Sequence, residues 1–241
     1  MDHQLKQLQD WISESRHIVF FGGAGVSTES GIPDFRSVDG LYHQQYAFPP
    51  ETILSHSFFE RNPEEFYRFY RSKMLFPQAR PNAAHWKLAE LEAAGKLTAV
   101  VTQNIDGLHQ AAGSKTVYEL HGSVHRNHCM KCRRFYGLDF LLETGGVPHC
   151  PACGGVVKPD VVLYEECLDE TTMEGAVEAI AGADMLIIGG TSRAVYPAAG
   201  LIRYYRGNRL ALINRSATPY DREAGLVINA SLGEVLGAIR V

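Results

Sequence analysis

Residues 17–27, HIVFFGGAGVS, decide the fold of this chain. The first half is a short apolar run, typical of a buried strand in a parallel sheet, and the second half is a glycine-rich turn. Glycines directly after a first strand let the backbone approach a pyrophosphate, whose oxygens the turn amides can bind. The match to G-x-G-x-x-G is incomplete, because Thr28 stands at the third glycine position. A plain strand-to-helix turn therefore remains an alternative.

Outward from this turn, short apolar runs alternate with helical patterns. We expect strands at residues 97–102, 116–120, 184–189, 209–214 and 226–229, an extended segment at 161–164, and helices at 4–15, 62–76, 83–95, 106–112, 171–181, 197–205 and 231–239. This alternation predicts an α/β fold with a Rossmann-like, doubly wound parallel sheet. Residues 30–50 are polar and contain Gly and Pro, which predicts a long ordered loop with a functional role.

Two C-x-x-C pairs interrupt this pattern. The first is Cys129 and Cys132, the second is Cys150 and Cys153, and 17 residues lie between them. The spacing is typical of a tetrahedral Zn²⁺ site closed by four thiolates. Since no position is left for water or substrate, we expect the metal to be structural. The surrounding residues have little apolar periodicity, which predicts a small inserted zinc-binding module at residues 124–158.

Polar clusters follow four of the expected strands. They are TQNID at residues 102–106, HG at 121–122, GTS at 190–192, and Asn214. In open parallel sheets, ligands bind outside the carboxyl ends of the strands, so a shared site explains these clusters better than chance. Taken singly, each has a plainer explanation, because Asn104 or Asp106 can cap a helix and a lone His is often structural.

The composition excludes several classes of protein. The chain has 241 residues, of which 45% are hydrophobic and 21% charged, so wholesale disorder is excluded. The formal net charge of −4 provides no global basic field for nucleic acid. No apolar run approaches the roughly 18 residues of a membrane span, and the polar N-terminus lacks a signal-peptide pattern. We therefore expect a cytoplasmic protein that binds neither membrane nor nucleic acid directly, and we take a monomer as the default, since oligomeric state cannot be read from the sequence.

Taken together, these segments resemble the sirtuins, the NAD-dependent protein lysine deacylases, in their bacterial form. The matching motifs are GAGVS at 23–27, GIPDFR at 31–36, TQNID, HG, the cysteine quartet, GTS and Asn214, in the family's order. The resemblance implies a Rossmann-like NAD-binding domain at residues 1–123 and 159–241. A helical and loop insertion occupies about 30–80, and a zinc-ribbon module occupies 124–158.

The resemblance also implies the reaction and its residues. NAD is a co-substrate: the acyl oxygen of an acyl-lysine protein attacks the nicotinamide ribose, and nicotinamide, free lysine and O-acyl-ADP-ribose are released. His121 is the expected general base, since an imidazole titrates near neutral pH, with Asn104 and Asp106 as further catalytic residues. The residues implied to bind NAD are Gly23, Ala24, Gly25, Ser27, Asp34, Phe35, Arg36, Gln103, Asn104, Ile105, Asp106, His121, Gly190, Thr191, Ser192, Asn214 and Ser231.

The substrate peptide is expected to add as a strand along Val161, Val162, Leu163 and Tyr164. In the family this segment commonly reads V-V-x-F-G-E, so Glu165 replaces a glycine here. That carboxylate either favours basic residues in the substrate or faces solvent. Arg193 is a second departure, since an apolar residue is usual at that position.

The acyl preference follows from one helix. Relatives that prefer succinyl or malonyl groups carry a Tyr-x-x-Arg pair there. Tyr67 matches the Tyr, Tyr70 stands where the Arg is expected, and Arg71 lies about 100° around the helix. An apolar pocket for acetyl or longer aliphatic groups is therefore expected.

Three other functions compete with deacylation. Protein ADP-ribosylation on the same NAD site is the main alternative, and it needs no base such as His121. A nicotinamide-dependent oxidoreductase usually has an acidic residue about 20 positions after the glycine turn, and this chain has no clear counterpart. A zinc ribbon that binds nucleic acid or protein would use the basic residues Arg126, Lys131, Arg133 and Arg134, for which a solvated face is the plainer explanation.

Overall fold

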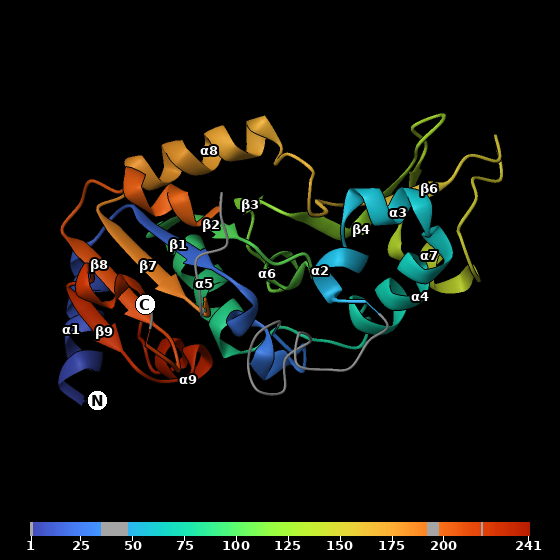
Figure 1. Cartoon of the computed structure of the whole chain (residues 1–241). Coiled ribbons are helices and arrows are strands. Elements are labelled where there is room, and N and C mark those ends of the chain that lie inside the picture. Colours follow the sequence, from blue (N-terminus) through green and yellow to red (C-terminus); the bar gives the residue numbers. More distant parts are fainter. Residues whose placement is uncertain (1, 35–47, 192–197, 218) are drawn as a thin grey trace.

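A six-stranded sheet forms the centre of the larger lobe in this computed structural model, which describes residues 2–34, 48–191, 198–217 and 219–241 (Figure 1). All of its neighbouring strands are parallel, and their order is β3-β2-β1-β7-β8-β9. The strands are β1 (Ile18–Gly22), β2 (Leu97–Thr102), β3 (Val117–Glu119), β7 (Met185–Gly189), β8 (Arg209–Ile213) and β9 (Leu226–Ile228). The predicted doubly wound parallel sheet is confirmed.

The winding direction of the sheet reverses between β1 and β7. The chain proceeds from β1 to β2 and β3 on one side, then returns to place β7, β8 and β9 on the other. A crevice forms at such a switch point because the connections leave the two strands in opposite directions. The glycine turn follows β1, and Gly190 follows β7, so both lie at this crevice.

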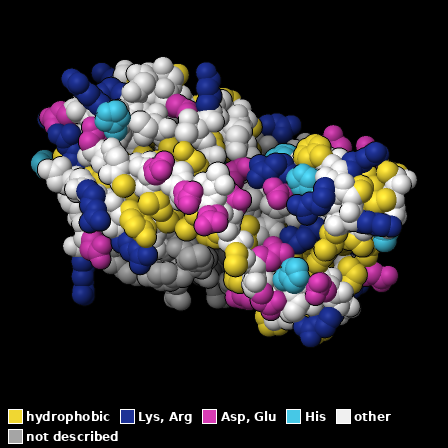
Figure 2. Space-filling model, turned by 90° about the horizontal axis from the view of Figure 1, so that it is seen from above, with side chains coloured by type: hydrophobic (Ala, Val, Ile, Leu, Met, Phe, Trp, Pro, Cys, Tyr) yellow, Lys and Arg dark blue, Asp and Glu magenta, His cyan; other side chains and the backbone are white. Residues whose placement is uncertain are grey.

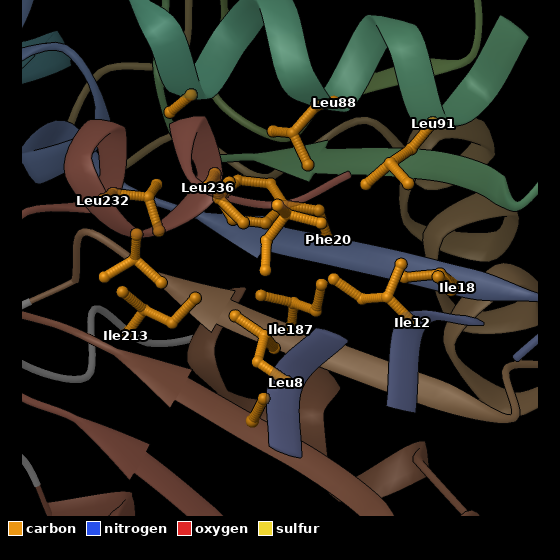
Figure 3. Packing of buried hydrophobic residues seen from close by; sticks show 14 of the residues in the cluster. Leu8, Ile12, Ile18, Phe20, Leu88, Leu91, Ile187, Ile213, Leu232 and Leu236 are labelled. Carbon is orange, nitrogen blue, oxygen red and sulfur yellow. The ribbon is translucent and has the colours of Figure 1, made fainter. Parts of the chain in front are cut away.

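Helices cover both faces of the sheet, because the strand side chains alternate between them. Phe20 and Ile187 point to the face covered by α1 (Asp2–Glu14), α5 (Ala83–Ala93) and α9 (Leu232–Gly237). Figure 3 shows Leu88 of α5 and Leu236 of α9 beside Phe20. Phe21 and Ile188 point to the opposite face, where α8 (Glu170–Ala181) and the 3-10 helix η4 (Ala198–Tyr204) pack.

A smaller lobe holds the cysteines and a three-stranded antiparallel sheet, ordered β5-β4-β6. Its elements are β4 (Gly122–Cys129), β5 (Phe135–Tyr136), β6 (Val157–Val161) and α7 (Leu138–Glu143). Three earlier helices, α2 (Pro50–Ile53), α3 (His56–Arg61) and α4 (Pro63–Lys73), share a core with this lobe. Phe58 and Phe66 there pack into one cluster with Val124, Leu141 and Val161. The domain boundaries given above stay a prediction.

Several elements differ from the sequence-based expectation. The helix expected at 106–112 shortens to α6 (Leu108–Ala111), which begins after Gly107 at φ 70°. The helix expected at 197–205 is the 3-10 helix η4. The segment 161–164, expected to be extended, begins at the end of β6 and forms a bridge from Tyr164 to Ser55. The described residues also form the 3-10 helices η1 (Ala24–Val26), η2 (Thr28–Ser30) and η5 (Pro219–Arg222). Within the described ranges, no helix is long and apolar enough to cross a membrane.

Candidate active site

A cleft of about 1330 Å³ runs along the carboxyl ends of the parallel strands and reaches the smaller lobe. It gathers most of the predicted NAD and peptide residues into one lining: Ala24, Gly25, Ser27, Asp34, Gln103, Asn104, Ile105, Asp106, His121, Val161, Val162, Leu163, Tyr164, Gly190, Thr191, Asn214 and Ser231. Phe35, Arg36, Ser192 and Arg193 lie outside the described residues. Gly23 is not part of the lining; a Cβ there would lie 3.0 Å from Gln103 Oε1.

The turns after β1 and β7 interlock at the floor of this cleft. The backbone N–H of Gly25 donates to the carbonyl of Gly190 at 2.7 Å. A Cβ on Gly25 would lie 2.7 Å from that same oxygen, and Gly190, at φ 63°, would carry a Cβ into the backbone nitrogen of Val26. Only glycine fits at both positions, so the turn presents bare backbone. It leads into the 3-10 helices η1 and η2, which fits a pyrophosphate site and a plain structural turn equally.

Three polar side chains next to the turn form one hydrogen-bonded group. Ser27 Oγ donates to Asp106 Oδ2 at 2.6 Å, and Asn104 Nδ2 donates to Ser27 Oγ at 3.1 Å. Asp106 Oδ1 also accepts from the N–H of Leu108, at the start of α6, at 2.9 Å. Burial raises the pKa of Asp106, while the hydrogen bonds from Ser27 and Leu108 lower it. Asp106 therefore supports α6 and also orients Ser27 and Asn104.

His121 lines the cleft with its proton position fixed by the backbone. Its Nδ1 lies 3.0 Å from the carbonyl oxygen of Gln103. A carbonyl oxygen only accepts, so Nδ1 carries the proton and Nε2 is the basic nitrogen. Burial lowers the pKa of His121 below its usual value, against the effect of the Gln103 hydrogen bond, which raises it. The imidazole is neutral at pH 7 and can accept a proton at Nε2.

A second histidine at the cleft escaped the sequence analysis. His125 Nε2 donates to the backbone carbonyl of Asp106 at 3.0 Å. A Cβ on Gly107 would come within 2.7 Å of the His125 ring, so this close approach requires glycine. No sequence motif marks His125, because β4 brings it to the cleft from the smaller lobe.

The predicted peptide segment is held by backbone hydrogen bonds to two other stretches. The N–H of Val162 donates to the carbonyl of His121 at 3.0 Å. The N–H of Tyr164 donates to Leu54 O, and its carbonyl accepts from His56 N, each at 3.0 Å. Glu165 lies beside this segment, and its carboxylate accepts from both the N–H and the hydroxyl of Ser57. Glu165 is exposed, but its carboxylate is bound to α3, and a preference for basic substrate residues stays a prediction.

The helix expected to set the acyl preference, α4, keeps its Tyr67, Tyr70 and Arg71 side chains out of the cleft, whereas Lys73 at its end lines the cleft. Tyr67 Oη donates to Val157 O at 2.5 Å, and Arg71 Nε donates to Leu141 O at 2.9 Å. Tyr70 is fully buried, and its ring stacks on Phe66. None of Tyr67, Tyr70 and Arg71 lines the cleft. The prediction that Arg71 points elsewhere is confirmed.

The four predicted zinc ligands converge outside the cleft. Their sulfur atoms all lie within 4.8 Å of one another, with Cys129 and Cys153 at 3.4 Å and Cys132 and Cys150 at 3.7 Å. Zn–S bonds of about 2.3 Å in a tetrahedron place sulfurs roughly 3.8 Å apart, which these spacings fit. After the second cysteine of each pair, Arg133 and Gly154 have φ of 61° and 72°. The two knuckles thus turn alike, and the cysteines can hold a structural zinc ion.

Arg126, one of the basic residues of the zinc-binding lobe, has acidic neighbours. Arg126 is paired with Glu119 and with Asp160, whose Oδ2 lies 2.8 Å from Arg126 Nε. Figure 2 shows Lys and Arg side chains interspersed with Asp and Glu over the face in view. This mixture favours the solvated-face interpretation of these residues.

Comparison with known proteins agrees with this geometry. A family model described as the Sir2 family matches residues 23–197. An NAD-dependent protein deacetylase of Clostridium perfringens is 61% identical over 242 residues, covering 99% of each chain. A solved complex of Sir2 with a p53 peptide and NAD⁺ is 41% identical, with a TM-score of 0.84 over 96% of this chain and 95% of that one. A Sir2 variant solved with deacetylated p53 peptide and 3′-O-acetyl-ADP-ribose is 40% identical, with a TM-score of 0.88 and the same coverage.

Proposed function

The chain belongs to the Sir2 family, and from that premise we propose how its residues carry out NAD-dependent protein deacetylation. It is an NAD-dependent protein deacetylase, and the relatives favour this activity over ADP-ribosylation. NAD, when bound, supplies the ribose carbon that the acyl oxygen attacks. Its ADP-ribose part is also the acceptor to which the acyl group is transferred from lysine. The single observation that carries the mechanism is His121, a neutral base at the centre of the cleft.

We propose that two features hold NAD: the interlocked glycine turns, and the hydrogen-bonded side chains of Ser27, Asn104 and Asp106, called the Ser27 group below. The bare backbone around Gly25 supports a pyrophosphate site, because N–H groups can approach phosphate oxygens without side-chain interference. Ser27, Asn104 and Asp106 hold one another in fixed orientations, which suits recognition of the nicotinamide amide and its ribose. Asn214 and Ser231 also line the cleft, where they would meet the adenosine.

His121 would act as the general base that takes a proton from a ribose hydroxyl. The Gln103 carbonyl holds the proton on Nδ1, so Nε2 is ready to accept another without a tautomer change. Its lowered pKa keeps the base unprotonated at neutral pH. Val162, whose N–H is bonded to the carbonyl of His121, places the peptide segment directly beside this base.

We propose residues 161–164 as the edge that receives the acyl-lysine peptide, and an aliphatic acyl group such as acetyl as the one removed. Tyr67 and Arg71 support this preference, because neither lines the cleft, and Tyr67 Oη and Arg71 Nε are bonded to Val157 and Leu141 instead. The zinc ion would hold the two cysteine knuckles together and takes part in no step.

We further propose that the protein acts in the cytoplasm as a monomer that needs no nucleic acid. Bacterial relatives and a thiolate metal site suited to a reducing compartment support the location. Light scattering would test the oligomeric state, and DNA retention measured against salt concentration would test nucleic-acid binding.

Mass spectrometry of an acetyl-lysine peptide tests the mechanism. The peptide is incubated with the enzyme, with and without NAD, beside a His121→Ala variant. We expect NAD-dependent loss of acetyl, matching amounts of nicotinamide and O-acetyl-ADP-ribose, and turnover lower by between about a hundredfold and ten-thousandfold in the variant. Nicotinamide release that leaves ADP-ribose on protein would instead establish a transferase.

A further inference from the structure

Glu165 holds a backbone conformation that its side chain disfavours. Its φ is 76°, and Arg133 is the other non-glycine residue at positive φ among those the structure describes. The carboxylate accepts from Ser57 N at 2.9 Å and from Ser57 Oγ at 3.1 Å. A left-handed conformation in a residue with a Cβ persists where surrounding contacts fix it, and here α3 supplies them.

Glu166, the next residue, gathers three further donors. Its carboxylate accepts from the N–H of Leu163 at 2.8 Å, from Lys158 Nζ at 3.2 Å and from His56 Nδ1 at 2.8 Å. The backbone N–H of His56 also donates to Tyr164 O. Lys158 of β6 and His56 of α3 thus hold the Glu166 carboxylate, which binds the backbone of Leu163, while the His56 N–H binds that of Tyr164.

We propose that His56, Glu165 and Glu166 form a clamp that holds residues 161–164 in the conformation that receives the acyl-lysine peptide. They are positioning residues and set how tightly the peptide binds. A peptide that adds through backbone hydrogen bonds binds tighter to an edge that is already ordered, because less entropy is lost. The inference rests on the proposed peptide site. The hydrogen bonds of the clamp do not involve the glycine turns or the Ser27 group.

The clamp gives peptide binding a pH dependence of its own. The hydrogen bond to Glu166 raises the pKa of His56, opposed by desolvation and helped by Glu60, whose Oε1 lies 3.4 Å from His56 Nε2. Lys158 shares Glu166, and Arg61 donates to Ser57 beside Glu165. A raised pKa means that the charge is present at low pH and is lost as pH rises through it. Peptide binding should therefore weaken toward alkaline pH, whereas protonation of His121 reduces catalysis toward acid pH.

Steady-state kinetics on the full-length enzyme test the clamp. We expect Glu166→Gln and His56→Gln to raise KM for an acetyl-lysine peptide about three- to tenfold, with KM for NAD and kcat within twofold of wild type. Glu165→Gly, which removes the Ser57 contacts and also the unfavourable backbone conformation, should raise peptide KM without unfolding the protein. His56→Gln should also remove the alkaline rise in peptide KM. Glu64→Gln, an exposed acid on α4, is the matched control.

Three results would overturn the proposal. The first is an unchanged peptide KM in His56→Gln and Glu166→Gln, and the second is an equal rise in KM for NAD, which would indicate general damage. The third result comes from a peptide that carries a photoreactive group, which should label the segment 161–166 in the wild-type enzyme. Labelling elsewhere would overturn both the peptide site and the clamp, whereas labelling there with an unchanged KM would overturn the clamp alone.

Discussion

At the scale of single residues, two histidines outside the cleft make the free energy of unfolding depend on pH. His85 on α5 and His109 on α6 lie fully buried with ring centroids 4.8 Å apart. His85 Nδ1 accepts from Asn82 N, and the other ring nitrogens of the pair have no hydrogen-bond partner among the described residues. Burial lowers the pKa of His85 to about 4 and that of His109 to about 3, so both rings are neutral.

Acid should therefore destabilise the protein through this pair. Both rings have pKa values in the folded state below the ordinary 6.5, so the unfolded chain binds more protons and stability falls as pH drops below that value. From pH 7 to pH 5, each histidine should cost about 2 kcal/mol of unfolding free energy. Urea denaturation at both pH values measures this, and His85→Gln should remove about half of the difference. An equal pH dependence in that variant would contradict the assignment.

At the scale of elements, the switch point between β1 and β7 depends on two turns packed so closely that neither leaves room for a side chain on the other. The turn after β1 donates Gly25 N–H to Gly190 O, and neither residue leaves room for a Cβ. Asn82, which caps α5, donates to Val26 O and Ser30 Oγ and so joins this helix to the same turn. The proposed pyrophosphate site is thus fixed by contacts between elements far apart in the chain.

Gly25→Ala should separate these two turns. The added Cβ meets Gly190 O at 2.7 Å, so we expect a loss of about 1–3 kcal/mol in unfolding free energy. Because the turn amides would shift, KM for NAD should rise roughly tenfold or more, with peptide KM little changed. Thermal denaturation and initial rates measure both effects. Gly145→Ala, where a Cβ meets nothing within 4 Å, is the control and should match wild type; an unchanged KM for NAD in Gly25→Ala would refute the role of the turn.

The sequence predicted the elements whose signal is local. Apolar runs located all six parallel strands, and motifs at strand ends located His121 and Asp106. The antiparallel pairing of β4 with β6 and the packing of α2–α4 against it depend on distant contacts, which leave no periodic pattern. His125 and the Glu165–Ser57 hydrogen bonds were missed for the same reason.

At the scale of the whole molecule, two lobes of different construction enclose one cleft. Two apolar layers pack on opposite faces of the larger lobe's sheet and stabilise it, and Figure 3 shows part of one of them. The zinc-binding end of the smaller lobe has a core cluster of only Cys129, Cys150 and Val157 with a few half-buried neighbours. Such a small core needs a metal to remain folded.

Removal of zinc should therefore unfold the smaller lobe and abolish activity, although the metal lies outside the cleft. Tyr67 Oη is bonded to Val157 O, so disorder near the knuckles reaches α4. A strong chelator, or Cys132→Ser, should lower the melting temperature by roughly 10 °C or more, and added zinc should restore the chelated enzyme. Cys167→Ser, at an exposed cysteine outside the quartet, should behave as wild type. Full activity in metal-free protein would contradict a structural zinc.

The central claim is that His121 acts as a neutral base inside the cleft formed by both lobes. The most direct measurement is the pH dependence of kcat/KM for NAD-dependent deacetylation, at saturating peptide. Because burial lowers the pKa of His121, the acid limb should have an apparent pKa below the ordinary 6.5, with activity lost as pH falls through it. The residual activity of His121→Gln should show no such acid limb, whereas His125→Gln should retain it. An acid limb at or above 6.5, or one that survives in His121→Gln, would contradict the claim.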